Sequence, residues 1–172
     1  LDKKVGEGEY TVFLTADHGA VQVPAFLADQ RVRAGYPDSG EMHRRFGEFL
    51  QYTYGTTDIV RATSNSQIFL DHDVLRNLEL EPAQVQAQMA GELLGYDGIN
   101  RVYTATQMQG STYQDGIPAI LQQGYNQKRS GDLLLVYDPG FAEYSRTGST
   151  HGTVHNYDTH IPLIFYGHGV RP

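Results

Sequence analysis

The sequence predicts an α/β protein, and three observations lead to this fold class. Apolar runs of strand length alternate along the chain with amphipathic runs of helix length. The 172 residues are enough for one globular domain with a sizeable core. A hydrophobic share of 40% and a charged share of 19% are ordinary for such a protein.

The first part of the chain is expected to hold a buried strand, a helix and a strand pair. EYTVFLTADHG, residues 9–19, has the apolar run of a buried strand and ends in a glycine turn. GEMHRRFGEFLQYTYG, residues 40–55, has the periodicity of an amphipathic helix. DIVRAT and SQIFLDH, residues 58–63 and 66–72, are rich in β-branched and aromatic residues, and the Ser-Asn pair at 64–65 between them indicates a hairpin.

A second helix is expected over EPAQVQAQMAGELLG, residues 81–95. Its proline suits the first helical turn, and a glycine closes it. Val85, Met89 and Leu93 recur at four-residue steps, as a buried stripe does.

The rest of the chain continues the alternation. RVYTATQM, residues 101–108, has strand character, and IPAILQQGYN, residues 117–126, has the pattern of a shorter helix. GDLLLVYDPGF, residues 131–141, is continuously apolar, like a strand of a sheet buried on both faces. HIPLIFYGHG, residues 160–169, is a further apolar strand that ends in glycines. Residues 57–107 are expected to form a small strand-strand-helix-strand subdomain, away from the edge of the sheet that carries the candidate ligands described below.

Composition excludes several classes of function. A net charge of −7 argues against nucleic-acid binding, which needs a basic face. The chain has no cysteine, which excludes disulfides and thiolate metal sites. No signal peptide is visible in it, and no apolar stretch approaches the roughly 20 residues that span a bilayer. Since it begins at Leu1 without methionine, we expect it to be a piece of a longer protein.

Asp17 and His18 are the first candidate metal ligands, because they stand side by side where an apolar strand ends. Gly19 permits the sharp turn that would let both side chains face one ion. Open parallel sheets collect ligands at the carboxyl ends of their strands, which is where this pair is expected to lie. The alternative is structural: Asp17 caps a following helix and His18 makes a local hydrogen bond.

The second candidate site is GSTHGTVHNYDTHIPLIFYG, residues 148–167. His151 and His155 have the i, i+4 spacing of a zinc pair on a helix, but the glycines around His151 favour a loop. We therefore expect only one of these two histidines to be a ligand. Tyr157 and Asp158 are interpreted as a structural turn at the entrance to the last strand.

The other candidate residues are given structural roles. His43 is expected on a solvated helix face and His168 in a loop. The Asp-His-Asp triplet at 71–73 follows a strand and precedes a helical segment, so turn and capping roles explain it. Thr15 and Thr153 were considered as nucleophiles, and neither is expected to be one.

Three segments together resemble a known family. FLTADHGA, GYNQKRSGDLLLVYDPG and STHGTVHNYDTHIPLIFYGHG, in this order, resemble the alkaline phosphatase superfamily. The match is best with single-chain bacterial alkaline phosphatases related to type I phosphodiesterases and nucleotide pyrophosphatases, and it runs from about Gly8 to Val170. The resemblance implies an α/β fold with an alkaline-phosphatase-like sheet flanked by helices, partly present here, and a small α+β subdomain inserted in it.

The resemblance also implies a site with two zinc ions. Asp17 and His18 match the pair that binds the zinc at the nucleophile, and His151 matches a ligand of the other zinc. We therefore expect these three residues to converge in the folded chain. The family's Thr or Ser nucleophile, an acidic ligand followed four residues later by histidine, and a phosphate-gripping Lys/Arg pair all lie upstream of such segments. No Asp-x-x-x-His occurs here, so residues 1–172 are expected to be a fragment of the catalytic domain without a nucleophile.

The function implied for the intact protein is phosphate monoester hydrolysis through a covalent phospho-threonine or phospho-serine, with the fragment inactive and its zinc binding weak or absent. The alternatives are a phosphodiesterase or nucleotide pyrophosphatase of the same superfamily, or a metal-free binding domain on the same scaffold. The expected partner is a small phosphate ester, with no nucleic acid and no membrane insertion. Family habit implies a periplasmic or secreted location.

Overall fold

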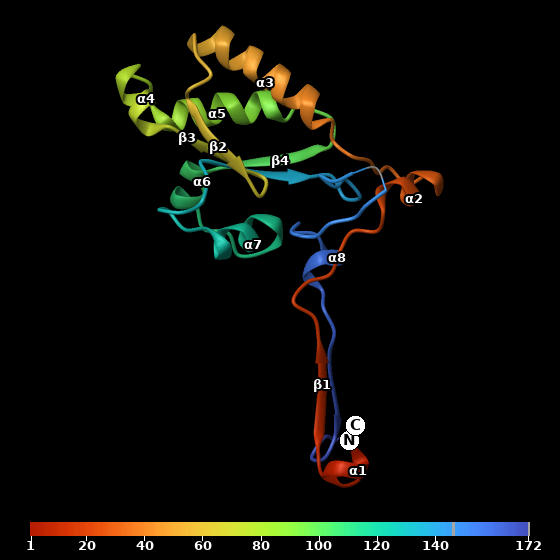
Figure 1. Cartoon of the computed structure of the whole chain (residues 1–172). Helices are drawn as coiled ribbons and strands as arrows, with labels where there is room; N and C mark the ends of the chain where they lie inside the picture. The colour runs from red at the N-terminus through yellow and green to blue at the C-terminus, as the bar shows by residue number, and fades with distance from the viewer. Residues whose placement is uncertain (146, 172) are drawn as a thin grey trace.

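A computed structural model describes residues 1–145 and 147–171 of the chain. The molecule has two parts, a body of sheet and helices and a long two-stranded ribbon that projects from it (Figure 1). Both chain termini lie at the far end of the ribbon. The chain therefore leaves the ribbon into the body after residue 15 and returns to it before residue 163.

The described residues form short helices and short strands in alternation. The helices are α1 (Asp2–Val5), α2 (Pro24–Asp29), α3 (Ser39–Tyr54), α4 (His72–Asn77), α5 (Pro82–Leu93), α6 (Ala105–Gly110), α7 (Gly116–Gly124) and α8 (Asn156–Thr159). The strands are β1 (Thr11–Thr15), β2 (Val60–Ser64), β3 (Gln67–Leu70), β4 (Ile99–Thr104), β5 (Leu133–Tyr137) and β6 (Leu163–Gly167). The sequence anticipated α3, α5, α7 and each strand, with element ends shifted by a few residues.

The body is built on a four-stranded sheet in the order β2-β3-β5-β4. Every pairing in it is antiparallel. The prediction for β5 itself is confirmed, since this apolar strand lies inside the sheet and is buried along most of its length. A continuous apolar run reports burial on both faces but says nothing about the direction of the neighbouring strands.

Helices α3 and α5 lie together over one side of this sheet, while α7 lies on the opposite side (Figure 1). The predicted stripe on α5 is confirmed, because Val85, Met89 and Leu93 are at most 2% exposed. Each such side chain contributes roughly 1.5–3 kcal/mol through its removal from water. The stripe packs into one core with Leu50 of α3 and Leu133 of β5.

The predicted subdomain of residues 57–107 is part of a larger unit. It contains β2, β3, α5 and β4, and β2 and β3 form the expected antiparallel hairpin. The hairpin turn is at Asn65 and Ser66, which both have positive φ, one residue later than the sequence indicated. However, β5 from outside the range lies between β3 and β4, so the sheet is completed by a later part of the chain.

The strand expected over residues 101–108 is shorter than predicted. It ends at Thr104, whose hydroxyl accepts a hydrogen bond from the Gln107 backbone N–H, while the Gln107 side chain accepts from the Thr104 N–H. This reciprocal capping box starts α6, so residues 105–108 are helical rather than extended.

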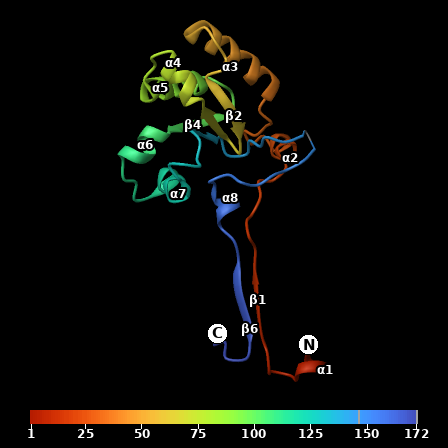
Figure 2. The same cartoon turned by 60° about the vertical axis from the view of Figure 1, so that its left-hand side comes forward.

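The ribbon pairs β1 with β6 in antiparallel register, with Phe13 opposite Phe165 and Leu14 opposite Ile164. Both strands were expected to be buried, and this is wrong for the chain as described, where Phe13 is 66% exposed and Leu163 is 65% exposed. Figure 2 shows the ribbon standing clear of the body. Its side chains are apolar on both faces, the pattern of strands that lie inside a covered sheet.

No helix among residues 1–145 and 147–171 is long and apolar enough to cross a membrane.

Candidate metal site

The two candidate segments meet where the ribbon enters the body. Thr15 at the end of β1 is paired with Leu163 at the start of β6, so the turn after β1 and the loop before β6 leave the same end of the ribbon. The rings of His18 and His151 stack there with their centroids 3.5 Å apart and their planes 12° from parallel. This confirms that the segments converge, but at the junction of an antiparallel ribbon rather than at the edge of a parallel sheet.

Backbone contacts hold these two segments against each other. The N–H of Gly19 donates to the carbonyl of Asp158 at 2.8 Å, and the N–H of Val21 donates to the carbonyl of Thr150 at 3.3 Å. A Cβ at position 19 would lie 1.9 Å from the carbonyl oxygen of Tyr157. Gly19 is therefore required for the close approach of the two segments, which is a different reason from the turn for which it was predicted.

Asp17 and His18 are arranged in a way that suits a metal ion. The Nδ1 of His18 lies 2.7 Å from the carbonyl oxygen of Gly19 and donates its proton there, which leaves the lone pair on Nε2. That Nε2 lies 3.7 Å from Oδ2 of Asp17. Two ligand atoms on one tetrahedral zinc are roughly 3.3 Å apart, so a small adjustment would let both bind one ion.

The ligand set around these residues is incomplete. Within residues 1–145 and 147–171, no group of three or more His, Asp or Glu side chains is arranged to hold a metal ion. Asp17 and His18 bring two donor atoms near each other, and the ring of His151 stacks on His18 without completing a three-residue group. The donor types fit zinc, and metal binding by the three residues stays a prediction.

Other histidines are occupied elsewhere. The Nε2 of His155 lies 2.9 Å from the carbonyl oxygen of Tyr137, which anchors the loop to the end of β5. The Nδ1 of His43 lies 2.6 Å from the carbonyl oxygen of Ser39 on α3, as a surface helix residue would. His168 lies at the far end of the ribbon, where its backbone N–H donates to the carbonyl of Tyr10.

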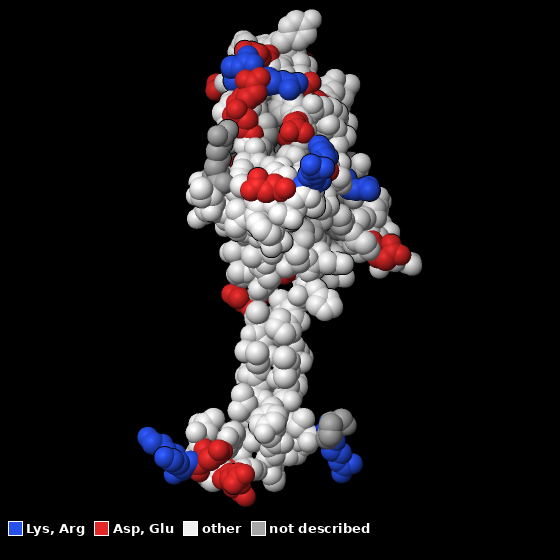
Figure 3. Space-filling view, turned by 90° about the vertical axis from the view of Figure 1, so that its right-hand side faces the viewer, with Lys and Arg blue, Asp and Glu red and all other residues white. Residues whose placement is uncertain are grey.

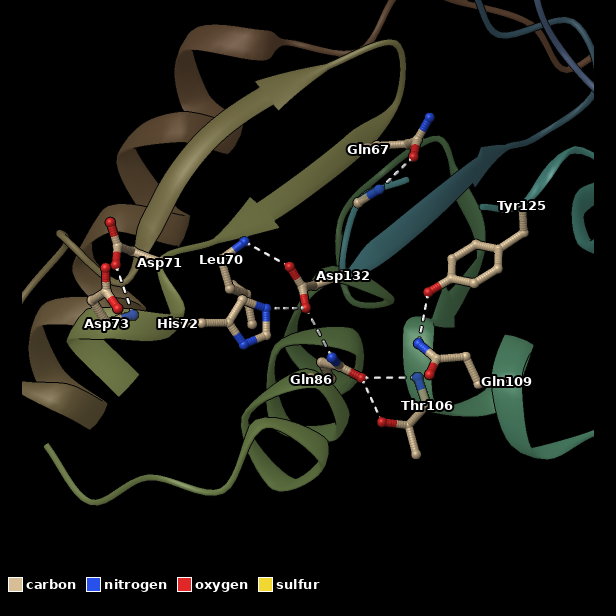
Figure 4. Close-up of polar contacts among 11 residues, drawn as sticks. Gln67, Leu70, Asp71, His72, Asp73, Gln86, Thr106, Gln109, Tyr125 and Asp132 are labelled. Carbon is tan, nitrogen blue, oxygen red and sulfur yellow. Dashed lines mark hydrogen bonds and ion pairs between the residues drawn. The ribbon is translucent and has the colours of Figure 1, made fainter. Parts of the chain in front are cut away.

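The Asp-His-Asp triplet has the structural role expected for it. Asp71 caps α4 by accepting from the backbone N–H groups of Asp73 and Val74. The Nε2 of His72 lies 3.0 Å from Oδ1 of Asp132, and Figure 4 shows that this carboxylate is the centre of a network.

The sequence reasoning missed Asp132. It accepts hydrogen bonds from the backbone N–H of Leu70 at 2.9 Å and from the Gln86 side chain at 3.0 Å, besides its contact with His72. Gln86 in turn accepts from the N–H and hydroxyl of Thr106 (Figure 4). The network joins β3, α4, α5 and α6, and its partners are spread so widely along the chain that no local motif identifies it.

A hollow of about 310 Å³ lies beside His151. One wall holds Tyr137, whose hydroxyl donates to Glu143 at 3.3 Å. Burial and the nearby Glu143 carboxylate raise the pKa of Tyr137 above its ordinary value, so the phenol stays neutral at physiological pH. The hollow therefore offers a neutral hydroxyl and a carboxylate next to one candidate ligand.

In the view of Figure 3, charged side chains gather on the body and at the ribbon's tip, and the ribbon between them shows none. Thr15 and Thr153, which are not expected to be nucleophiles, make local contacts. The hydroxyl of Thr15 lies 3.5 Å from the adjacent Ala16 carbonyl oxygen, and that of Thr153 lies 3.3 Å from the His155 N–H.

Known proteins resemble this chain in sequence. The family model described as type I phosphodiesterase / nucleotide pyrophosphatase matches residues 1–160. A protein named calcium-transporting ATPase from Myroides odoratus is 36% identical over the whole chain. Alkaline phosphatase PafA from Elizabethkingia meningoseptica is 34% identical over 99% of the chain, and alkaline phosphatase PhoV from Synechococcus elongatus is 31% identical over all of it.

Solved structures show the same likeness. The crystal structure of wild-type alkaline phosphatase PafA superimposes on 99% of the chain with a TM-score of 0.85 and 34% identity. The match covers 32% of that structure, and the chain spans 31–32% of the length of the three relatives named above.

Proposed function

This chain belongs to the type I phosphodiesterase / nucleotide pyrophosphatase family, and from that premise we propose that its full-length protein is a zinc-dependent phosphate monoester hydrolase. The relatives that carry alkaline phosphatase names support hydrolysis of phosphoric esters. The observation that carries the proposal is the meeting of His18 and His151, with Asp17 beside them, from opposite ends of the chain.

In this proposal Asp17 and His18 hold one zinc ion and His151 contributes to a second. Bound zinc supplies Lewis-acid stabilisation of the charge on the oxygens of the transferred phosphoryl group. The carbonyl of Gly19 fixes the tautomer of His18, so that Nε2 is free to bind metal. The packing of the Gly19 turn against Tyr157 and Asp158 holds the two sets of ligands together.

The nucleophile, a Thr or Ser that becomes phosphorylated, and the remaining ligands are proposed to come from parts of the protein outside these residues. The chain spans less than a third of the relatives' length, which leaves ample polypeptide to supply them. The proposed substrate is a small phosphate ester in the periplasm or outside the cell. The net charge of −7 supports a small substrate rather than a nucleic acid.

The second candidate is a phosphodiesterase or nucleotide pyrophosphatase, which the description of the matching family favours. The two functions differ in how much negative charge the site must bind, because a monoester carries one charge more than a diester. The full-length protein should therefore be assayed with p-nitrophenyl phosphate and with bis(p-nitrophenyl) phosphate. A higher kcat/KM on the monoester supports the proposal, and a higher value on the diester supports the second candidate.

Metal dependence tests the site itself. A chelator should abolish turnover and added zinc should restore it, whereas a metal-free binding domain would show neither zinc nor turnover. Asp17→Ala, His18→Ala and His151→Ala should each lower kcat/KM by more than the roughly 10–100-fold lost with an outer-shell partner. His43→Ala is the matched control, since this histidine lies on α3 and should leave activity unchanged. Full activity in the His18→Ala and His151→Ala variants would contradict the proposed site.

A further inference from the structure

Asp158, which was interpreted from the sequence as a turn residue, is buried beside the candidate ligands. It is 4% exposed and has no cationic partner within residues 1–145 and 147–171, which is rare for a buried carboxylate. Its Oδ2 accepts a hydrogen bond from the backbone N–H of Thr153 at 2.6 Å. Bonds from an N–H to a charged oxygen are short and strong, so this contact fixes the loop that carries His151.

The same residue also fixes the other segment. Its backbone carbonyl accepts from the N–H of Gly19 at 2.8 Å, directly after His18. One residue thus holds the His151 loop through its side chain and the Asp17–His18 turn through its main chain. The two segments meet at the base of the ribbon, so their relative position depends on such cross-contacts.

The second carboxylate oxygen is not used for folding in the part of the chain that the structure describes. Oδ1 of Asp158 is buried there without a hydrogen-bond partner, whereas the carboxylate of Asp132, whose side chain is 12% exposed, uses both of its oxygens. A buried carboxylate oxygen left unpaired is uncommon and calls for an explanation, of which a functional role is one. This points to a role for Asp158 beyond closing a turn.

We propose that Asp158 is a positioning residue of the metal site: it sets the zinc affinity by holding the His151 loop against the Asp17–His18 turn. The inference rests on the proposed function, since it assumes that these residues bind zinc. Its mechanism is preorganisation, because ligands held in place before the ion arrives bind it more tightly than ligands that must first be ordered.

The test compares zinc affinity in the full-length protein, measured by competition with a chromophoric chelator. Asp158→Ala should weaken zinc binding by roughly 10–100-fold, the usual cost of losing an outer-shell partner. Asp158→Asn keeps an oxygen for the Thr153 N–H and should recover part of that loss. The matched control is Asp132→Asn, a change to a hydrogen-bonded, largely buried carboxylate within the four-stranded sheet, which should lower stability without changing zinc affinity.

Amide hydrogen exchange on the metal-free protein gives a second readout. In Asp158→Ala the amides of Gly19 and Thr153 should exchange faster, and in Asp132→Asn they should not. Zinc affinity within twofold of wild type in both Asp158 variants would overturn the inference, as would an equal loss in Asp132→Asn. If Asp158→Ala does not fold, Asp158→Asn decides by the same measurements. If the wild-type protein binds no zinc, the proposed function fails, while unchanged exchange at Gly19 and Thr153 would show separately that Asp158 holds neither segment.

Discussion

Replacing Gly19 by alanine is the most direct perturbation of the candidate site, because one methyl group enters a contact between two backbones. The new Cβ would lie 1.9 Å from the carbonyl oxygen of Tyr157 and 3.3 Å from the Cα of Asp158. The first distance is about 1.5 Å short of an ordinary contact, and no flexible side chain can move to relieve it. The Asp17–Gly19 turn must therefore separate from residues 157–158.

The cost can be worked from the contacts that this separation breaks. Overpacking costs typically about 1–3 kcal/mol, and the lost bond from Gly19 N–H to the Asp158 carbonyl adds about 1 kcal/mol. The free energy of unfolding should thus fall by about 2–4 kcal/mol. Because the His18 ring would leave its stack on His151, zinc affinity should fall at least as far as with an outer-shell substitution, roughly 10–100-fold.

Two glycines provide the matched control. Gly47 in α3 and Gly91 in α5 have nothing within 4 Å of an added Cβ, so alanine there should raise the free energy of unfolding by about 0.5–1 kcal/mol. The assays are denaturant unfolding and zinc titration of the full-length protein. Wild-type stability and zinc affinity in Gly19→Ala would refute the described contact between the two segments.

Three further predictions concern the chain, the ribbon and the core. The isolated 172-residue chain should show no turnover of p-nitrophenyl phosphate and little bound zinc by metal analysis, because it supplies too few ligands; turnover that Asp17→Ala or His18→Ala removes would contradict this. If the apolar ribbon is covered in the full-length protein, Phe13→Lys should make the isolated chain more soluble by sedimentation and should lower the thermal unfolding temperature of the full-length protein. An unchanged or higher unfolding temperature of the full-length protein would argue against a covered ribbon. The raised pKa of Tyr137 means that the folded state holds the phenol proton more tightly than the unfolded state. The contribution of this phenol to the free energy of unfolding is therefore complete below about pH 10 and is lost at higher pH. Between pH 8 and 11 the free energy of unfolding should accordingly fall less in Tyr137→Phe than in the wild type. An equal fall in both would exclude Tyr137 as the source of the alkaline destabilisation.

Local elements were predictable because local chemistry determines them. The spacing of Val85, Met89 and Leu93 is a property of one helix, and the Asp71 cap acts within three residues of itself. Gly19 is different: the sequence indicated it through a turn, but the structure requires it because Tyr157, from a distant part of the chain, packs against it. Family resemblance then identified Asp17, His18 and His151 as one group, which periodicity by itself could not do.

Strand direction and burial were not predictable, because they depend on which neighbour a strand meets. The run at residues 133–137 is equally apolar in a parallel or an antiparallel sheet, and the chain places β5 between β3 and β4 from a distance. Phe13 and Phe165 have the pattern of buried strands, yet in the described chain they pair only with each other. An apolar strand is stable only when another segment covers it, and the tertiary structure alone decides whether such a segment is there.

The sequence by itself therefore determined the α/β class, the main helices and strands, the family and the identity of the candidate ligands. The tertiary structure alone decided that β1 and β6 form a ribbon, that His18 stacks on His151, and that Asp132 and Asp158 are buried carboxylates with structural partners. The physical reason is the range of the interactions. Capping and hydrophobic periodicity act over a few residues, whereas a buried carboxylate depends on donors contributed by segments that only the fold brings together.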